Sequence, residues 1–216
     1  MRQAFVVFCA ATTVLPILSA SRTTTDRPRS SQAAQPVEVS ATQAPRGVTK
    51  LEGVHWIQIK GPAIGRLLAA VARPPGPGPY STVVVLHGSH GFAREYVQLA
   101  SDLARSGLQA VAPCWFAGSS GGAGQRFVTP IACPKAPPIS MASSPEALHT
   151  IDSIVQAVSQ LPHTSPNRIV LFGHSRGGGA ALNYILRNTG IYATVLDSTG
   201  YPPELAAVAA QVHGRA

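Results

Sequence analysis

The residue best suited to chemistry is Ser175, the centre of the pentapeptide GHSRG at 173–177. An apolar run at 168–172 precedes this pentapeptide, and a helix-like stretch at 177–187 follows it. A strand that passes through Gly-x-Ser-x-Gly into a helix makes a tight, strained turn that presents the serine Oγ above a sheet. Because serine is a weak nucleophile alone, it needs a base and donors for the developing oxyanion. The pentapeptide predicts attack by Ser175 on an acyl carbon.

The oxyanion donors are expected to come from two backbone N–H groups. Arg176 supplies one, since it follows the nucleophile, and Ser89 supplies the other from the loop LHGSHGF at 86–92. Glycines on both sides of Ser89 let this backbone approach a ligand closely. In the same loop, His87 is expected to brace the backbone by hydrogen bonding. His90 is expected to face the cleft, with a role as base as the alternative.

The acid and the base of such a site are harder to locate. Asp197 follows the apolar run at 192–196 and is the candidate acid, because it would lie at the carboxyl end of a strand. His213 is the histidine that follows Ser175 in the sequence, so it is the candidate base. His174 adjoins the nucleophile and is expected to have a packing or entrance role. Histidine spacings typical of a metal site are absent from the sequence, so no metal is expected.

Alternating strand and helix patterns must position these residues. Strands are predicted at 55–60, 67–72, 82–86, 110–116, 168–172 and 192–196, and helices follow Tyr96, Ser144 and Ser175. The segment 117–140 is rich in Gly, Pro and Ser and is long for a plain connection, which predicts a functional loop. The pattern predicts an α/β three-layer sandwich with a mainly parallel sheet.

With these motifs the chain resembles the α/β-hydrolase superfamily, and within it the dienelactone hydrolase-like and cutinase-like polyester hydrolase branches. The resemblance covers residues 51–216 and rests on the segments 86–89 and 173–178. It implies hydrolysis of a small or polymeric carboxylic ester through an acyl-enzyme, without a metal or an organic cofactor. It also implies that Phe92 or Trp115 lines an acyl pocket, with burial as ordinary core as the alternative.

The chain departs from the family after the predicted strand at 192–196. In such hydrolases the acid and the histidine follow the seventh and eighth strands, so this chain is expected to lack the last strands of the fold. The alternative function is a non-catalytic hydrolase-like remnant or binding protein. In that case the strand at 192–196 is expected to be an exposed edge through which the protein self-associates.

Composition bounds these hypotheses. With 216 residues, 45% of them hydrophobic and 12% charged, the chain has enough apolar sequence for one well-buried domain. The net charge of +8 comes mainly from arginines that are scattered along the sequence. Because nucleic-acid binding requires basic side chains that cluster on one face, no nucleic-acid partner is expected.

The N-terminal part predicts export. Residues 1–20 resemble a cleavable signal peptide, which predicts a secreted or periplasmic protein with no stable membrane span after cleavage; an N-terminal membrane anchor is the alternative. Residues 21–50 are expected to form a disordered leader, and residues 51–216 the hydrolase domain. Cleavage would leave Cys114 and Cys133, an even pair that predicts a disulfide; two buried thiols are the alternative.

Overall fold

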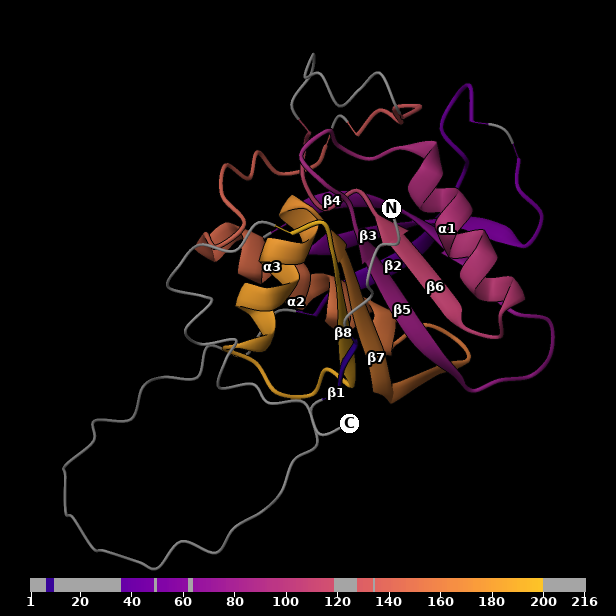
Figure 1. Ribbon diagram of the computed structural model, residues 1–216. Helices are drawn as coiled ribbons and strands as arrows, with labels where there is room; N and C mark the ends of the chain where they lie inside the picture. The colour runs from indigo at the N-terminus through magenta and orange to yellow at the C-terminus, as the bar shows by residue number, and fades with distance from the viewer. Residues whose placement is uncertain are drawn as a thin grey trace, which may run out of the picture.

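The computed structural model describes residues 7–9, 36–48, 50–61, 64–118, 128–133 and 135–199. These residues contain one mixed sheet and three helices (Figure 1). The strands are β1 (Val7–Cys9), β2 (Glu38–Thr42), β3 (Val54–Gly61), β4 (Gly65–Ala72), β5 (Tyr80–Leu86), β6 (Gln109–Pro113), β7 (Thr164–His174) and β8 (Ala193–Asp197). The helices are α1 (Arg94–Arg105), α2 (Pro145–Ser159) and α3 (Arg176–Ile185).

The strand order is β1-β8-β7-β5-β6-β4-β3-β2. Strands β6, β5, β7 and β8 are mutually parallel, whereas β2, β3 and β4 run as an antiparallel meander that joins the sheet through β6. Helices α2 and α3 pack with one face of the sheet, and α1 packs on the other, which gives three layers (Figure 1). The predicted α/β sandwich with a mainly parallel centre is therefore confirmed.

Local signals explain the central elements. Strand β5 is an uninterrupted apolar run at 83–86, and these four side chains are buried because helices cover both faces of the sheet. Helix α1 ends at Arg105, and Gly107 follows with a φ of 89° that suits glycine; the Gly107 N–H donates to the Ala104 carbonyl at 3.0 Å. At the start of α2 the Ser144 hydroxyl accepts from the Ala147 N–H at 3.2 Å, as expected for an N-cap residue.

Both ends of the sheet differ from the sequence prediction. The segment 38–42, expected to be disordered, forms β2 and pairs with β3. Strand β8, expected to be an open edge, pairs antiparallel with residues 7–9 because its free backbone groups accept any extended segment. The remaining residues of 1–20 and those after Thr199 lie outside the described residues. The signal peptide, the missing last strands and self-association therefore stay predictions.

Candidate active site

Ser175 occupies the sharp turn between β7 and α3. Its φ of 51° and ψ of −115° are unusual for a residue with a side chain, and such strain persists only where surrounding structure holds it. The Ser175 N–H donates to the carbonyl of Asp197 at 2.8 Å, which fixes the turn against the end of β8. The structure thus gives the pentapeptide the strained strand-to-helix geometry that presents a serine above a sheet.

Glycines allow the three elements around Ser175 to approach one another. A Cβ at Gly173 would lie 2.4 Å from the Gly177 carbonyl oxygen, and a Cβ at Gly177 would lie 2.1 Å from that of Leu86. Both neighbours are backbone atoms, which cannot swing aside as a flexible side chain can. The turn therefore lies where β5, β7 and α3 come closest. The two flanking positions must be glycine because any side chain there would clash with backbone atoms.

The predicted oxyanion segments lie beside this turn. A Cβ built on Gly88 would be 3.3 Å from the Ser175 Cβ, so the loop after β5 lies against the serine. Ser89 follows Gly88 in a turn closed by the Gly91 N–H, which donates to the Gly88 carbonyl at 3.1 Å. Arg176 is the first residue of α3, where helical N–H groups have no acceptor within the helix. Both predicted donor residues therefore flank the serine.

Tyr96 on α1 holds the oxyanion loop. The Gly88 N–H donates to Tyr96 Oη at 3.0 Å, and the same oxygen lies 2.8 Å from His90 Nε2. The His90 and Tyr96 rings stack at 5.5 Å between centroids, and the His174 ring lies 5.8 Å from that of His90. Burial raises the pKa of Tyr96 to about 12, so the hydroxyl keeps its proton at neutral pH. The sequence predicted Tyr96 only as part of the apolar face of a helix, because no sequence pattern marks its contacts with Gly88 and His90.

Asp197 lies at the predicted edge of the sheet, and its partner is His174. Its Oδ2 is 2.8 Å from His174 Nδ1, and the Ser198 hydroxyl donates to Oδ1 at 3.0 Å. The His174 and Asp197 side chains are 31% and 28% exposed, so water reaches both. The structure thus pairs the candidate acid with a histidine to which the sequence assigned packing, and His213 lies outside the described residues.

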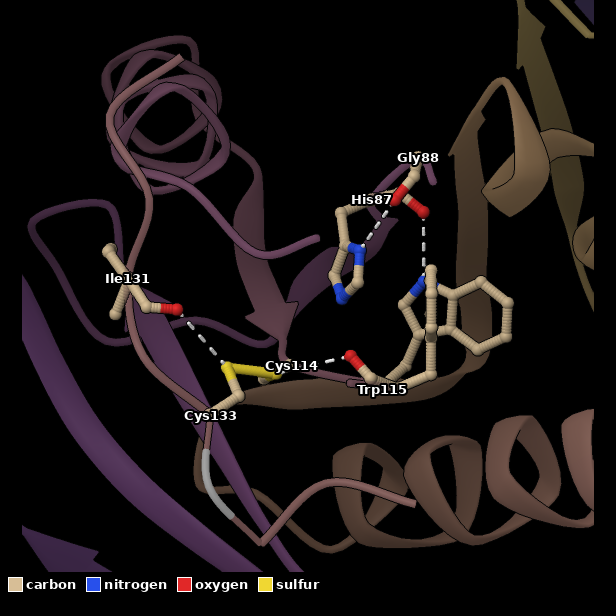
Figure 2. The surroundings of a disulfide bond; sticks show 7 residues. His87, Gly88, Cys114, Trp115, Ile131 and Cys133 are labelled. Atoms are coloured by element: carbon tan, nitrogen blue, oxygen red, sulfur yellow. Dashed lines mark hydrogen bonds between the residues drawn. A yellow bond between two sulfur atoms is a disulfide. The ribbon is translucent and has the colours of Figure 1, made fainter. Parts of the chain in front are cut away.

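His87 is buried beneath the loop. Its Nδ1 is 3.0 Å from the Gly88 carbonyl, which agrees with the predicted brace, and its ring stacks on Phe116 at 4.7 Å between centroids. Burial lowers the pKa of His87 to about 3, so the imidazole is neutral. Trp115 donates from Nε1 to the His87 carbonyl at 3.0 Å (Figure 2). Trp115 and Phe92 are buried at 0% and 3% exposure, which favours ordinary core over an acyl pocket for both.

The predicted disulfide joins Cys114 to Cys133 with a Cα–Cα distance of 6.3 Å (Figure 2). It ties the residue that follows β6 to the segment at 128–133. Ser140 lies farther along the chain, and its carbonyl accepts from the Arg176 guanidinium of α3. This guanidinium lies 5.1 Å from the centre of the Phe116 ring. Arg176 thus holds Ser140 beside the start of α3, next to the serine.

Within the described residues, no cluster of three His, Cys, Asp or Glu side chains could hold a metal. In the same part of the chain, no helix is both long and apolar enough to cross a membrane.

A parallel-centred sheet with a strained serine turn at its carboxyl edge defines the α/β-hydrolase class of protein. The family model for the dienelactone hydrolase family matches residues 67–210, so the chain belongs to this family. The resemblance inferred from the motifs is therefore confirmed. No curated protein matches the sequence.

Solved structures show similar folds. DcsB, solved with its substrate analogue, is 15% identical with a TM-score of 0.50, and the match covers 64% of this chain and 42% of that one. A Klebsiella pneumoniae protein assigned as a dienelactone hydrolase is 17% identical over 72% of this chain and 57% of its own, with a TM-score of 0.46. Est1E from Butyrivibrio proteoclasticus is 16% identical over 63% and 47%, with a TM-score of 0.45. The chain spans about half the length of these structures.

Proposed function

We propose that this chain is a serine hydrolase that acts on carboxylic esters through an acyl-enzyme at Ser175. The observation that carries the proposal is the backbone of Ser175, a non-glycine residue held at φ 51° between β7 and α3. Membership of the dienelactone hydrolase family supports the same activity. If the turn were only structural, glycine would adopt this conformation with less strain. The presence of serine therefore favours a use for its side chain.

The proposed reaction has two acyl transfers. Ser175 Oγ attacks the ester carbonyl carbon while a histidine takes the hydroxyl proton, and the resulting oxyanion accepts from the N–H groups of Arg176 and Ser89. The bond from the carbonyl carbon to the alkoxy oxygen then breaks, and the alcohol leaves with that proton. Water attacks the acyl-enzyme in the same way, which releases the carboxylic acid and restores Ser175. Each step uses only groups of this chain and water.

Asp197 is the proposed acid, and two histidines compete for the role of base. His174 is supported by its Nδ1 contact to Asp197, because a carboxylate on Nδ1 orients an imidazole and stabilises its charged form. His213 is supported by its position after Asp197 in the sequence, the order that the family uses. Since Gly88 lies against both Ser175 and His174, a base at His174 would be next to the oxyanion loop.

A fluorophosphonate probe tests the nucleophile directly. The folded chain should be labelled at Ser175 and should hydrolyse para-nitrophenyl acetate, and Ser175→Ala should abolish both. Ser89→Ala is the matched control, because this change keeps the backbone N–H that the proposal uses; its labelling should persist. Equal labelling of Ser175→Ala would refute the nucleophile. A folded chain that is neither labelled nor active would favour the non-catalytic binding protein.

The base is tested with His174→Gln and His213→Gln, each compared with Asp197→Asn. If His174 is the base, His174→Gln and Asp197→Asn should reduce kcat to a similar extent, while His213→Gln leaves kcat unchanged. The opposite ranking of the two histidine variants assigns the role to His213. Circular dichroism of each variant distinguishes loss of chemistry from loss of the fold.

We also propose that the protein is exported and that residues 1–20 are removed. The Cys114–Cys133 disulfide supports this proposal, since such bonds persist in oxidising compartments. Removal of residues 1–20 would also remove β1 and open the edge of β8, where self-association would then occur. The intact mass of the mature protein checks the cleavage, and retention of residues 1–20 would contradict it.

A further inference from the structure

We propose that Tyr96 is the positioning residue of the oxyanion loop and that its hydroxyl fixes His90 as a neutral imidazole with the proton on Nδ1. The proposal rests on the proposed function, because the loop matters for catalysis only if Ser175 is the nucleophile. Its structural content, the arrangement of protons around Tyr96 Oη, can be measured without any catalysis.

The first step concerns the backbone that Tyr96 holds. Gly88 is the residue before Ser89, and its buried N–H donates to Tyr96 Oη at 3.0 Å. A Cβ on Gly88 would lie 3.0 Å from His174 Cδ2, 3.3 Å from His90 Cε1 and 3.3 Å from Ser175 Cβ. Three side chains of the site thus converge on this glycine. A displacement of Gly88 would therefore move the Ser89 N–H relative to the serine.

The second step counts hydrogens at the hydroxyl. Tyr96 Oη must accept from Gly88, because an amide N–H can only donate. Its own hydrogen is then available for His90 Nε2 at 2.8 Å, and that nitrogen must act as the acceptor. A neutral imidazole that accepts at Nε2 carries its proton on Nδ1. A charged His90 would present an N–H to an oxygen that already accepts one and would leave the hydroxyl hydrogen without its acceptor.

The surroundings favour the same state. Burial and the neighbouring His174 lower the pKa of His90, and Glu95 on α1 acts in the opposite direction. Asp197, at the end of β8, interacts with Tyr96 and favours its neutral hydroxyl. Stacking at an interplanar angle of 13° fixes the ring of His90 on that of Tyr96. The unprotonated nitrogen of His90 is thereby occupied by the Tyr96 hydroxyl, which argues against a role as the base.

The test compares Tyr96→Phe with Tyr184→Phe. Tyr184 is the matched control, since it is also buried on a helix and its hydroxyl donates to Asp152 at 3.0 Å, away from the loop. Loss of the Tyr96 hydroxyl should reduce kcat for para-nitrophenyl acetate by about 10- to 100-fold, because a displaced oxyanion donor acts on the transition state. KM should stay within about threefold, and Tyr184→Phe should leave both constants near those of the unchanged protein.

Long-range proton–nitrogen spectra give the second readout, with His90→Gln to assign the resonance. The unchanged protein should show His90 protonated at Nδ1 and slow hydrogen exchange of the Gly88 amide. In Tyr96→Phe, His90 should populate both tautomers and the Gly88 amide should exchange faster. A proton on Nε2, or a folded Tyr96→Phe with unchanged kcat, would overturn the proposal. If the chain proves inactive, the proposed function fails alone, and the spectra still decide the arrangement at Tyr96.

Discussion

Replacing Gly177 with alanine tests whether the serine turn depends on the close approach of α3 to β5. The added Cβ would lie 2.1 Å from the Leu86 carbonyl oxygen and 2.8 Å from that of His87, whereas ordinary contact begins at 3.4 Å. Helix α3 would have to move by roughly 1 Å, and overpacking of this kind costs about 1–3 kcal/mol. Alanine in place of glycine stabilises a helix by up to about 1 kcal/mol, so we expect the free energy of unfolding to fall by a net amount of about 1–2 kcal/mol.

The same displacement should affect chemistry more than stability. Ser175 and the Arg176 N–H move with the start of α3, and a misplacement of about 1 Å costs on the order of 100-fold in rate. Gly179→Ala in the same helix is the control, because its Cβ would meet only the Ala142 Cβ at 3.5 Å. It should stabilise the protein by about 0.5–1 kcal/mol and keep its activity.

Urea denaturation and hydrolysis of para-nitrophenyl acetate measure the two effects. A Gly177→Ala variant that is as stable as Gly179→Ala and keeps its kcat would show that the serine turn does not depend on this contact. A variant that is destabilised but fully active would show that the strain relaxes away from Ser175, which would refute the link between the glycine contact and the chemistry.

Two further predictions concern stability. Replacing Cys114 and Cys133 together with alanine should lower the free energy of unfolding by about 3 kcal/mol, as expected for opening a loop with a separation of 19 residues, and an unchanged denaturation midpoint would contradict this. Burial lowers the pKa of His87 from 6.5 to about 3, so the unfolded chain binds an extra proton between these values. Stability should therefore fall as the pH drops below 6.5, with His87 contributing up to about 1.4 kcal/mol per pH unit. His87→Gln should flatten this slope in denaturation curves; an equally steep slope would assign the effect to other groups.

The sequence was sufficient for the centre of the fold and for the serine turn because their signals are local. An apolar run that ends in Gly-x-Ser-x-Gly specifies a strand, a turn and a helix within a few residues, and β5 is identified by its own apolar run. The disulfide could be predicted because removal of residues 1–20, which contain Cys9, would leave a single pair of cysteines.

Strand β2 shows where sequence patterns fail. Val39 and Ala41 alternate with polar residues, but the run is short and all of its side chains are exposed except for the partly buried Val39. The strand forms because backbone groups pair with β3, with Val39 opposite Ile59. Edge strands of this kind are specified by a neighbour rather than by their own side chains.

The polar contacts of the site could not be predicted from the sequence either, for a different reason. Tyr96 and Gly88 come from separate elements, and the pairing of His174 with Asp197 requires β7 and β8 to lie in register as parallel neighbours. Such contacts depend on tertiary geometry, and the residue types alone allow many pairings. Sequence patterns therefore located the nucleophile and the edge of the sheet, but they could not select which histidine meets Asp197.

That selection decides which histidine Asp197 orients. Asp197 has two carboxylate oxygens, and in the described structure His174 occupies one and Ser198 the other. A carboxylate that accepts from Nδ1 holds an imidazole in one tautomer and one orientation. A base at His174 therefore uses the Asp197 contact as it stands in the structure, whereas a base at His213 would have to share the carboxylate with His174 or replace it.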